Sequence, residues 1–339
     1  MNKKANIYDV AKLAGVSHQT VSRVLNNHSS LKPATREKVE KAITDLSYRP
    51  SQAARQLVTS QSRLIGVLIA EADLYGPASI LSAMEKVARH EGYSIISIAV
   101  SAGSRESWRE AIDQLRNLDI DGVMTIALPE QLVKEIENSL DGAAIVIVDS
   151  EPSKKFDVVY MDNIYGATIA TQYLIDAGHT EILHVTGPEN GYESNKRKTG
   201  YEKTMKDARL KPQVIVGDWS IAKGFEVGEK VAKMKKRPTA VFCANDHLAL
   251  GMIKAFSEAR INVPGDISII GFDNIPESSY LIPALTTVGQ NFDELGNNAI
   301  EKMLLQLRAG SKKEAVMIKP ALLLRNSTKE IKSGKRMKR

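Results

Sequence analysis

From Arg63 onward, short apolar runs alternate with stretches of helical periodicity, such as 78–91 and 167–177. Eight runs have the length of buried strands, and they read LIGVLIA, SIISIAV, GVMTIAL, AAIVIVD, EILHVTG, QVIVGD, TAVFCAN and DISIIGFD. Strands separated by helices form a parallel sheet with helices on both faces, so this part is predicted to be doubly wound α/β. Its roughly 265 residues are too many for one such sheet. We therefore expect two lobes with a cleft between them.

The whole chain of 339 residues suggests two or three domains. Its single cysteine, Cys243, excludes an internal disulfide framework and is expected to be a small buried hydrophobe inside a strand. The first residues, MNKKANIYDV, lack the apolar segment of a secretory signal, and no run approaches the roughly 20 apolar residues of a membrane helix. A cytoplasmic location without membrane contact is the expectation.

The net charge of +6 is concentrated at the two ends of the chain. Residues 1–62 hold ten Lys and Arg against four acidic residues, and 329–339 hold six against one. The tail shows no apolar periodicity and is expected to be disordered. The basic amino-terminal block has good apolar periodicity, so it is expected to fold and to favour a nucleic-acid partner.

Three short helices are predicted in this block. The first spans 7–14, AGVS forms a tight turn, and Ser17 has the side chain of an N-cap for a second helix over 18–26. Pro33 fits the first turn of a third helix with one apolar stripe, formed by Val39, Ala42, Ile43 and Leu46. Two helices joined by a short turn with glycine indicate a helix-turn-helix, an all-α DNA-binding headpiece.

The second helix has an unusually polar side. Contact with DNA explains this side better than simple exposure to solvent does. Three of its residues are predicted to face base edges, where glutamine pairs with adenine and arginine with guanine; they are His18, Gln19 and Arg23. Hydroxyl side chains beside them suit phosphate oxygens, namely Ser17, Thr20 and Ser22. The helix is therefore predicted to lie in the major groove.

The segment 49–62 is predicted to be a hinge. Pro50 could start a helix through Val58, but eight residues are too few to be helical alone in water. Such a helix would order only against a partner. Leu57 has no obvious local core and is a candidate wedge between base steps in the minor groove. The alternative is that Leu57 packs onto the following domain.

Polar residues follow several of the predicted strands. Ligands of open α/β sheets bind beyond the carboxyl ends of the strands, where this chain has Asp149, Asn245 and Asp273, with Arg197 beyond the strand that ends at Gly187. Together they offer directional hydrogen bonds to vicinal hydroxyls, and Trp219 and Phe292 could supply flat apolar faces for a sugar ring. Each also has a simpler explanation, as a turn residue, a surface base or part of the core.

Six motifs resemble the LacI/GalR family of bacterial repressors, and within it the lactose-repressor branch. They are IYDVAKLAGVSHQTVSRVLN, TREKVEKAITDLSYRPSQAARQL, GDWS, CANDHLALG, DISIIGFDN and IPALTTVGQNFDELG, and the likeness runs from about Ile7 to Thr328. It implies an operator-binding domain over 1–48, a hinge over 49–62, and a core over 63–328 with the fold of periplasmic sugar-binding proteins. The chain would cross between the lobes three times. The tail over 329–339 would follow.

The resemblance also assigns site residues and partners. It implies DNA contacts for the recognition helix and the hinge, adding Asn26 and Ala54 to the residues above and placing Leu57 in the minor groove. It implies sugar contacts for Asp149, Arg197, Asn245 and Asp273, and apolar pocket positions for Leu74, Pro77, Ile80, Met161, Trp219 and Phe292. The implied partners are pseudo-palindromic double-stranded DNA, a sugar effector and a second copy of the chain. No cofactor and no metal are implied.

Several positions depart from that branch. An arginine near the pocket mouth is replaced by Ala102, two serines by Gly191 and Glu193, and a phenylalanine of the wall by Met161. A galactoside-like ligand is suggested, but its identity stays open. His18 replaces a base-reading tyrosine, so the operator need not be the lac sequence. Leucine heptads are missing after Leu324, which implies a dimer rather than a tetramer.

Other classes of function are less well supported by the sequence. An enzyme would need phosphate or nucleophile machinery, but the sequence has no Walker loop, no GxGxxG after the first strand and no GxSxG, and its histidines lack metal-ligand spacing. A non-DNA-binding sugar receptor would share the lobes without the headpiece. A repressor that needs a corepressor, or an activator, stays open, because the sign of the coupling depends on which lobe arrangement each ligand prefers.

Overall fold

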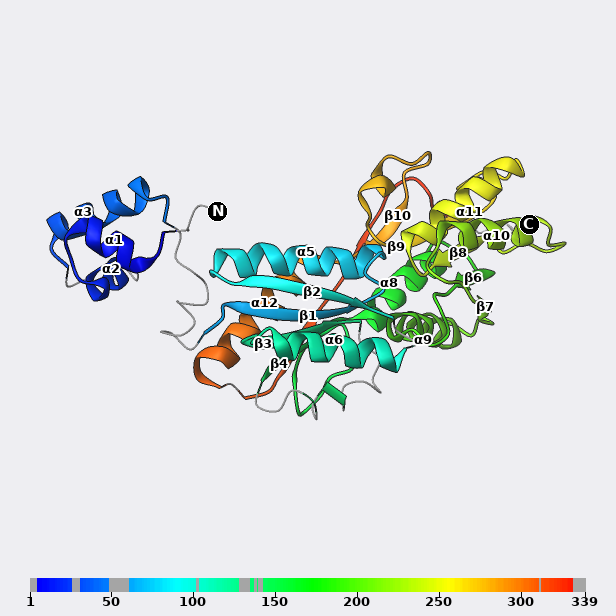
Figure 1. The fold of residues 1–339 in the computed structure, drawn as a ribbon. Coiled ribbons are helices and arrows are strands. Elements are labelled where there is room, and N and C mark those ends of the chain that lie inside the picture. The colour runs from blue at the N-terminus through cyan, green and yellow to red at the C-terminus, as the bar shows by residue number, and fades with distance from the viewer. Residues whose placement is uncertain are drawn as a thin grey trace, which may run out of the picture. The chain divides into compact units, whose positions relative to one another are not determined.

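The computed structural model describes residues 5–25, 31–48, 61–101, 104–127, 135–136, 139, 143–310 and 312–331. The chain divides into two compact units, residues 1–63 and residues 64–339 (Figure 1). Among the described residues, no helix combines the length and the apolar character needed to span a bilayer.

The first unit is a three-helix headpiece with its own core. Helix α1 (Ile7–Ala14) begins with a capping box between Asn6 and Asp9 and ends at Gly15, whose φ of +64° suits glycine. Helix α2 is His18–Leu25 and helix α3 is Pro33–Asp45. All three helices lie where the sequence predicts them. Their apolar sides meet in a small core of Val10, Ala11, Val21, Val24, Val39, Ala42 and Tyr48.

The first lobe of the second unit contains a six-stranded parallel sheet in the order β11-β5-β4-β3-β1-β2. Its strands are β1 (Leu64–Ala70), β2 (Ser94–Val100), β3 (Gly122–Ile126), β4 (Ala144–Val148), β5 (Asp157–Met161) and β11 (Ala315–Ile318). Its helices are α5 (Tyr75–His90), α6 (Arg105–Asn117) and α12 (Phe292–Ala309). Successive β1 residues point to opposite faces, so Ile65 packs in the cluster with α5 and α12, and Leu68 in the cluster with α6.

The second lobe contains another six-stranded sheet, in the order β12-β10-β9-β8-β6-β7. Its strands are β6 (Ile182–Val185), β7 (Gln213–Ile215), β8 (Ala240–Cys243), β9 (Ser268–Asp273), β10 (Thr286–Gly289) and β12 (Ala321–Leu323). Helices α8 (Asn163–Asp176) and α9 (Tyr192–Asp207) cover one face, and α10 (Ile221–Ala232) and α11 (Asp246–Glu258) the other. A short 3-10 helix, η1, spans Pro276–Ser279.

Three chain segments join the lobes. The chain leaves the first lobe after Met161, returns to it after Gly289, and leaves it again after Ile318 (Figure 1). The predicted three crossings are therefore present. As a result, α12 and β11 complete a lobe that began more than 220 residues earlier in the chain.

The predicted doubly wound architecture is confirmed, with one exception in strand direction. All eight apolar runs contain a strand, and helices α5 and α8 begin three to four residues before the predicted ranges. Four further strands, β5, β10, β11 and β12, were not predicted. Strand β12 pairs antiparallel with β10 at the edge of its sheet, so this sheet is mixed rather than purely parallel.

Candidate functional site

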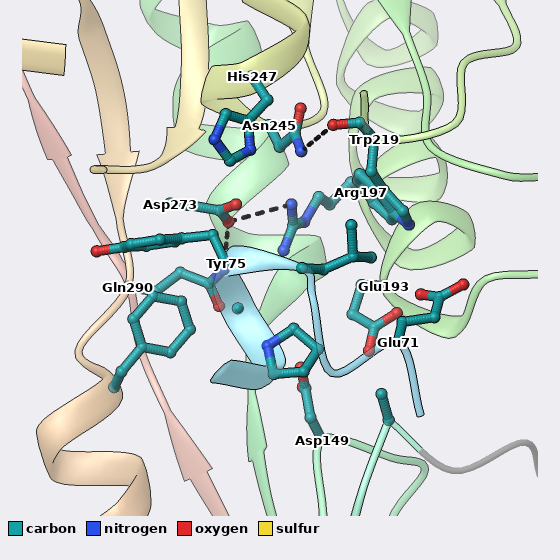
Figure 2. A pocket seen from close by; sticks show the side chains of 15 residues that line it. Glu71, Tyr75, Asp149, Glu193, Arg197, Trp219, Asn245, His247, Asp273 and Gln290 are labelled. Carbon is teal, nitrogen blue, oxygen red and sulfur yellow. Dashed lines mark hydrogen bonds and ion pairs between the residues drawn. The ribbon is translucent and has the colours of Figure 1, made fainter. Parts of the chain in front are cut away.

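A cavity lies between the two lobes, at the carboxyl ends of several strands. It has about 520 Å³ of space, including the part open to solvent. Fifteen residues line it (Figure 2): Glu71, Leu74, Tyr75, Gly76, Pro77, Ala127, Asp149, Glu193, Arg197, Trp219, Asn245, His247, Asp273, Gln290 and Phe292. The position agrees with the rule for open α/β sheets.

Eight of the ten predicted effector residues line this cavity: Leu74, Pro77, Asp149, Arg197, Trp219, Asn245, Asp273 and Phe292. The other two do not. Ile80 and Met161 are each 1% exposed and pack in the hydrophobic cluster of the first lobe, behind the cavity wall. Ile80 lies on the core-facing stripe of α5, and Met161 ends the buried strand β5. These positions support the wall rather than forming it.

Arg197 is the central cation of the cavity and is only 3% exposed. Its Nε donates to Oδ1 of Asn163 at 2.8 Å, and its Nη1 donates to the carbonyl of Ala244 at 2.5 Å and to Oδ1 of Asp273 at 3.5 Å. The guanidinium also lies over the Phe272 ring, 3.8 Å from its centroid. These contacts engage Nε and Nη1, so Nη2 is the part of the fork that remains for a ligand.

Asp273 ends β9 with a φ of +104° and accepts hydrogen bonds from both sides of the cavity. Gln290, in the second segment between the lobes, donates from Nε2 to Asp273 Oδ1 at 2.5 Å, the same oxygen that Arg197 reaches. Burial raises the pKa of Asp273, and Arg197 and Gln290 oppose that rise by stabilising the anion. The carboxylate thus sits between a cation and an amide.

Asn245 and Trp219 hold one another in place. Asn245 Oδ1 accepts from the backbone N–H of Leu248 and caps α11, while its Nδ2 donates to the Trp219 carbonyl, both at 2.9 Å. The Trp219 backbone has a φ of +74°, and its indole lies against Gly187, where a Cβ would be 2.3 Å from Cζ2. Only a glycine at 187 therefore lets the ring lie there.

Asp149 and Glu193 bring two carboxyl groups together in the cavity (Figure 2). Burial raises the pKa of Asp149 to about 6, although Arg197 opposes the rise. Burial and the nearby Asp149 raise the pKa of Glu193 to about 8. Asp149 also accepts a long hydrogen bond of 3.5 Å from the backbone N–H of Met161.

Sequence reasoning missed seven lining residues as site members: Glu71, Tyr75, Gly76, Ala127, Glu193, His247 and Gln290. A signal existed for two of them, because Glu71 and Ala127 directly follow β1 and β3, just as Asp149 follows β4. Glu193 was noted only as a replacement of a serine in the resembling branch. The other four lie at helix starts or in an interlobe segment, where no pattern marks the side chain that enters the cavity. No group of His, Cys, Asp or Glu among the described residues could hold a metal ion. Cys243 is fully buried, as predicted.

The headpiece presents a second candidate surface on α2. Ser17, His18, Gln19 and Arg23 are exposed, whereas Thr20 and Ser22 are half-buried. Ser17 Oγ accepts from the Thr20 N–H at 3.2 Å and lies 3.0 Å from its hydroxyl, so it caps the helix as predicted. The His18 ring lies 5.2 Å from that of Tyr8. Asn26, Ala54, Leu57 and Ala102 lie outside the described residues.

Known proteins show both parts of this arrangement. Residues 6–51 match the family described as bacterial regulatory proteins, lacI family, and residues 171–328 match the periplasmic binding protein-like domain. The repressor PurR of Vibrio parahaemolyticus is 34% identical over 336 residues, covering 96% of this chain and 99% of its own. The lactose operon repressor of Escherichia coli is 32% identical over 328 residues, covering 96% and 91%.

Solved structures agree. The crystal structure of the lac repressor dimer bound to operator and the anti-inducer ONPF superposes with a TM-score of 0.90 at 31% identity, covering 96% of this chain and all of the other. The similarity extends over the headpiece and both lobes. The chain therefore belongs to the lacI family of bacterial regulatory proteins and is a DNA-binding transcriptional repressor.

Proposed function

We propose that the chain represses carbohydrate-utilisation genes and is released from its operator by a neutral, galactoside-like sugar that binds between the lobes. The composition of the cavity wall carries this proposal. Asp149, Glu193 and Asp273 offer carboxyl oxygens, and Arg197 offers the two N–H groups of Nη2. Sugar hydroxyls both donate and accept, so they suit a wall that offers several carboxyl acceptors beside N–H donors.

A purine base is the competing effector, because relatives named PurR are about as similar to the chain as the lactose repressor is. A purine such as hypoxanthine or guanine presents ring nitrogens and a carbonyl oxygen as acceptors beside its N–H donors. Several of its acceptors would face carboxyl groups of Asp149, Glu193 or Asp273. Such unpaired acceptors cost free energy when they are buried. The wall therefore favours a polyol over a base.

The headpiece would contact the operator through α2. Gln19 and Arg23 are exposed on this helix and have side chains that pair bidentately with adenine and guanine. His18, beside Tyr8, would read a neighbouring base. Ser17, Thr20, Ser22 and Asn26 would position the helix on phosphates, and Ala54 and Leu57 would enter the minor groove.

The repressor would act as a homodimer on a pseudo-palindromic operator. Tyr280 and Ile282, between η1 and β10 of the second lobe, are 85% and 94% exposed. A second copy that covers these side chains would remove a substantial apolar area from water. Two-fold symmetry would then place two headpieces on two half-sites.

Induction would be a population shift between lobe arrangements. A sugar that binds one arrangement more tightly favours it, and the three interlobe segments allow the lobes to change orientation together. The arrangement favoured by the sugar would no longer suit the half-site spacing. Coupling of about 1 to 3 kcal/mol per site is typical of such linkage.

The test uses the full-length protein and an operator selected from random duplex DNA. Fluorescence anisotropy would measure operator affinity while lactose, galactose, cellobiose, hypoxanthine or guanine is added. We expect lactose or galactose to weaken operator binding and the two bases to have no effect. A base that tightens operator binding, with no sugar acting, would overturn the proposal. A sugar that tightens binding would show a corepressor instead.

A further inference from the structure

Asp149 and Glu193 form a contact between the two lobes. Asp149 follows β4 in the first lobe, and Glu193 lies in the first turn of α9 in the second. Both side chains line the cavity (Figure 2). Their carboxyl groups are close enough for a hydrogen bond between them, which lowers the pKa of Asp149. Two ionised carboxylates have no proton to donate. The contact therefore requires a proton on one of them.

The surrounding charges compensate the pair only in part, so the proton is still needed. Arg197 on α9 is the nearest cation, but Asn163, Ala244 and Asp273 already engage its Nε and Nη1. Lys196 on the same helix pairs with Glu151, which follows β4. The remaining neighbours are acids or phenols: Glu71 after β1, Asp273 on β9, Tyr160 on β5 and Tyr192 on α9.

The direction of the pKa shifts agrees with this geometry. Burial disfavours the ionised forms of both residues. The nearby Asp149 further raises the pKa of Glu193, to about 8, whereas the hydrogen bond with Glu193 opposes the rise for Asp149, whose pKa is about 6. Between these values the pair holds one proton and one negative charge. Above about pH 8 the pair loses this proton, and the buried Asp149 and the half-buried Glu193 then face each other as like charges across the lobes.

We propose that Glu193 and Asp149 form a proton-holding pair that effector binding requires, which makes Glu193 a specificity-determining residue for neutral polyols. This rests on the sugar-binding function proposed above. A bound sugar covers the pair and excludes water, so it further disfavours the doubly ionised form. The protonated pair offers one O–H donor and several acceptors, which match sugar hydroxyls.

The consequence is a proton linkage with a defined sign. Effector affinity is constant where the pair already holds its proton, from about pH 6.5 to 7.5. As pH rises above about 8.5, binding must take up a proton, and the dissociation constant rises by up to about tenfold per pH unit. Amide replacements remove this dependence, because an amide donates to the remaining carboxylate without titrating.

Isothermal titration calorimetry of the full-length protein tests this. The ligand is lactose, the expected inducer, and the titration is repeated from pH 6.5 to 9.5. At pH 9, two buffers of different ionisation enthalpy report the protons taken up, which we expect to approach one per site. Glu193→Gln and Asp149→Asn should each bind lactose with a flat pH profile. Asn is compatible with the φ of +57° at position 149.

Glu189→Gln is the matched control, because Glu189 lies on the loop before α9 but is exposed and outside the cavity. It should keep the wild-type pH profile. If the wild-type protein binds lactose with the same affinity at every pH, or takes up no proton on binding at pH 9, the proposed proton-holding pair is wrong. Galactosamine carries an ammonium group. If it binds more tightly than lactose and without proton uptake, a cation on the ligand replaces the proton of the pair, as the proposal expects. Absence of lactose binding at every pH would instead overturn the proposed effector class, and this inference with it.

Discussion

Arg197 donates a hydrogen bond from Nε to Oδ1 of Asn163, 2.8 Å away, and so connects the cavity wall to the first segment between the lobes. Asn163 is the first residue of α8 and is itself buried, with Nδ2 donating to the Met161 carbonyl. A ligand that binds Nη2 would therefore contact a group whose Nε holds an interlobe segment. This relationship makes Arg197 a positioning residue as well as the proposed sugar-binding residue.

Arg197→Lys should lower sugar affinity by roughly ten- to more than hundredfold, because a hydrogen bond with a charged partner contributes about 1.5 to 3 kcal/mol. Lysine lacks the planar fork and cannot serve Asn163, Asp273 and a ligand together. Calorimetry with the inducing sugar measures the effect. Operator affinity without sugar should stay near wild type.

The exposed Lys203 on the same helix supplies the control, since Lys203→Ala removes a charge far from the cavity wall. Arg197→Ala should also lower the free energy of unfolding, because it leaves Asp273 buried without its cation. Unchanged sugar affinity in Arg197→Lys would remove this residue from the binding site.

Gly187→Ala should displace the Trp219 indole, because the new methyl group would lie 2.3 Å from Cζ2. We expect weaker sugar binding and a changed tryptophan emission, while operator binding without sugar persists. Gly191→Ala is the control, since its nearest atom would lie at 3.3 Å and its backbone has an ordinary φ of −76°. Equal sugar affinity in both variants would show that the indole position does not matter.

Ile282→Asp should convert the dimer to a monomer, because a charge would replace an apolar side chain at the proposed interface. Sedimentation velocity measures the oligomeric state, and operator affinity should fall with it, since two linked headpieces bind two half-sites together. Leu118→Asp, in the first lobe and 41% exposed, should leave the oligomeric state unchanged. A dimeric Ile282→Asp protein would place the interface elsewhere.

Leu57→Ala should reduce operator bending and specific affinity without lowering the thermal stability of the lobes. This prediction comes from the sequence alone, since Leu57 lies outside the described residues. A wedge between base steps bends the duplex, and alanine is too small to open a step. Energy transfer between dyes at the two ends of the operator reports the bend, and the neighbouring Gln56→Ala serves as control. An unchanged bend would refute the wedge.

The fold was predictable where one strand or helix is long enough to show its own periodicity. Apolar runs such as Leu64–Ala70 matched strands because both faces of a parallel sheet are buried. The four missed strands are only three to five residues long and form the edge side of each sheet. Strand β11 contains the exposed Met317. Strand β12 follows the third crossing and pairs with β10, which precedes the second crossing. These segments form strands because they pair with strands that are distant in the sequence, and a local sequence pattern does not contain that information.

The cavity was predictable in its outline but not in its full lining. The rule for strand ends located Asp149, Asn245 and Asp273, since each directly follows or ends a strand. Ile80 was predicted to line the cavity. It lies one turn further along α5 than Pro77, and at that depth the helix packs against the hydrophobic cluster of the first lobe instead. Gln290 was missed because its role comes from the crossing segment that places it beside Asp273.

The three crossings fix the order in which the protein is completed during synthesis. The headpiece core involves only residues near the amino terminus, so it is complete early in translation. The first lobe must wait for α12 and β11, whose residues Leu295, Ile300, Met303 and Ile318 belong to its main cluster. At about 5 to 20 residues per second, the ribosome needs roughly 8 to 30 s to pass from the end of β5 to the end of β11. A nascent chain thus carries a finished DNA-reading module for many seconds before the lobe that completes its sensor exists.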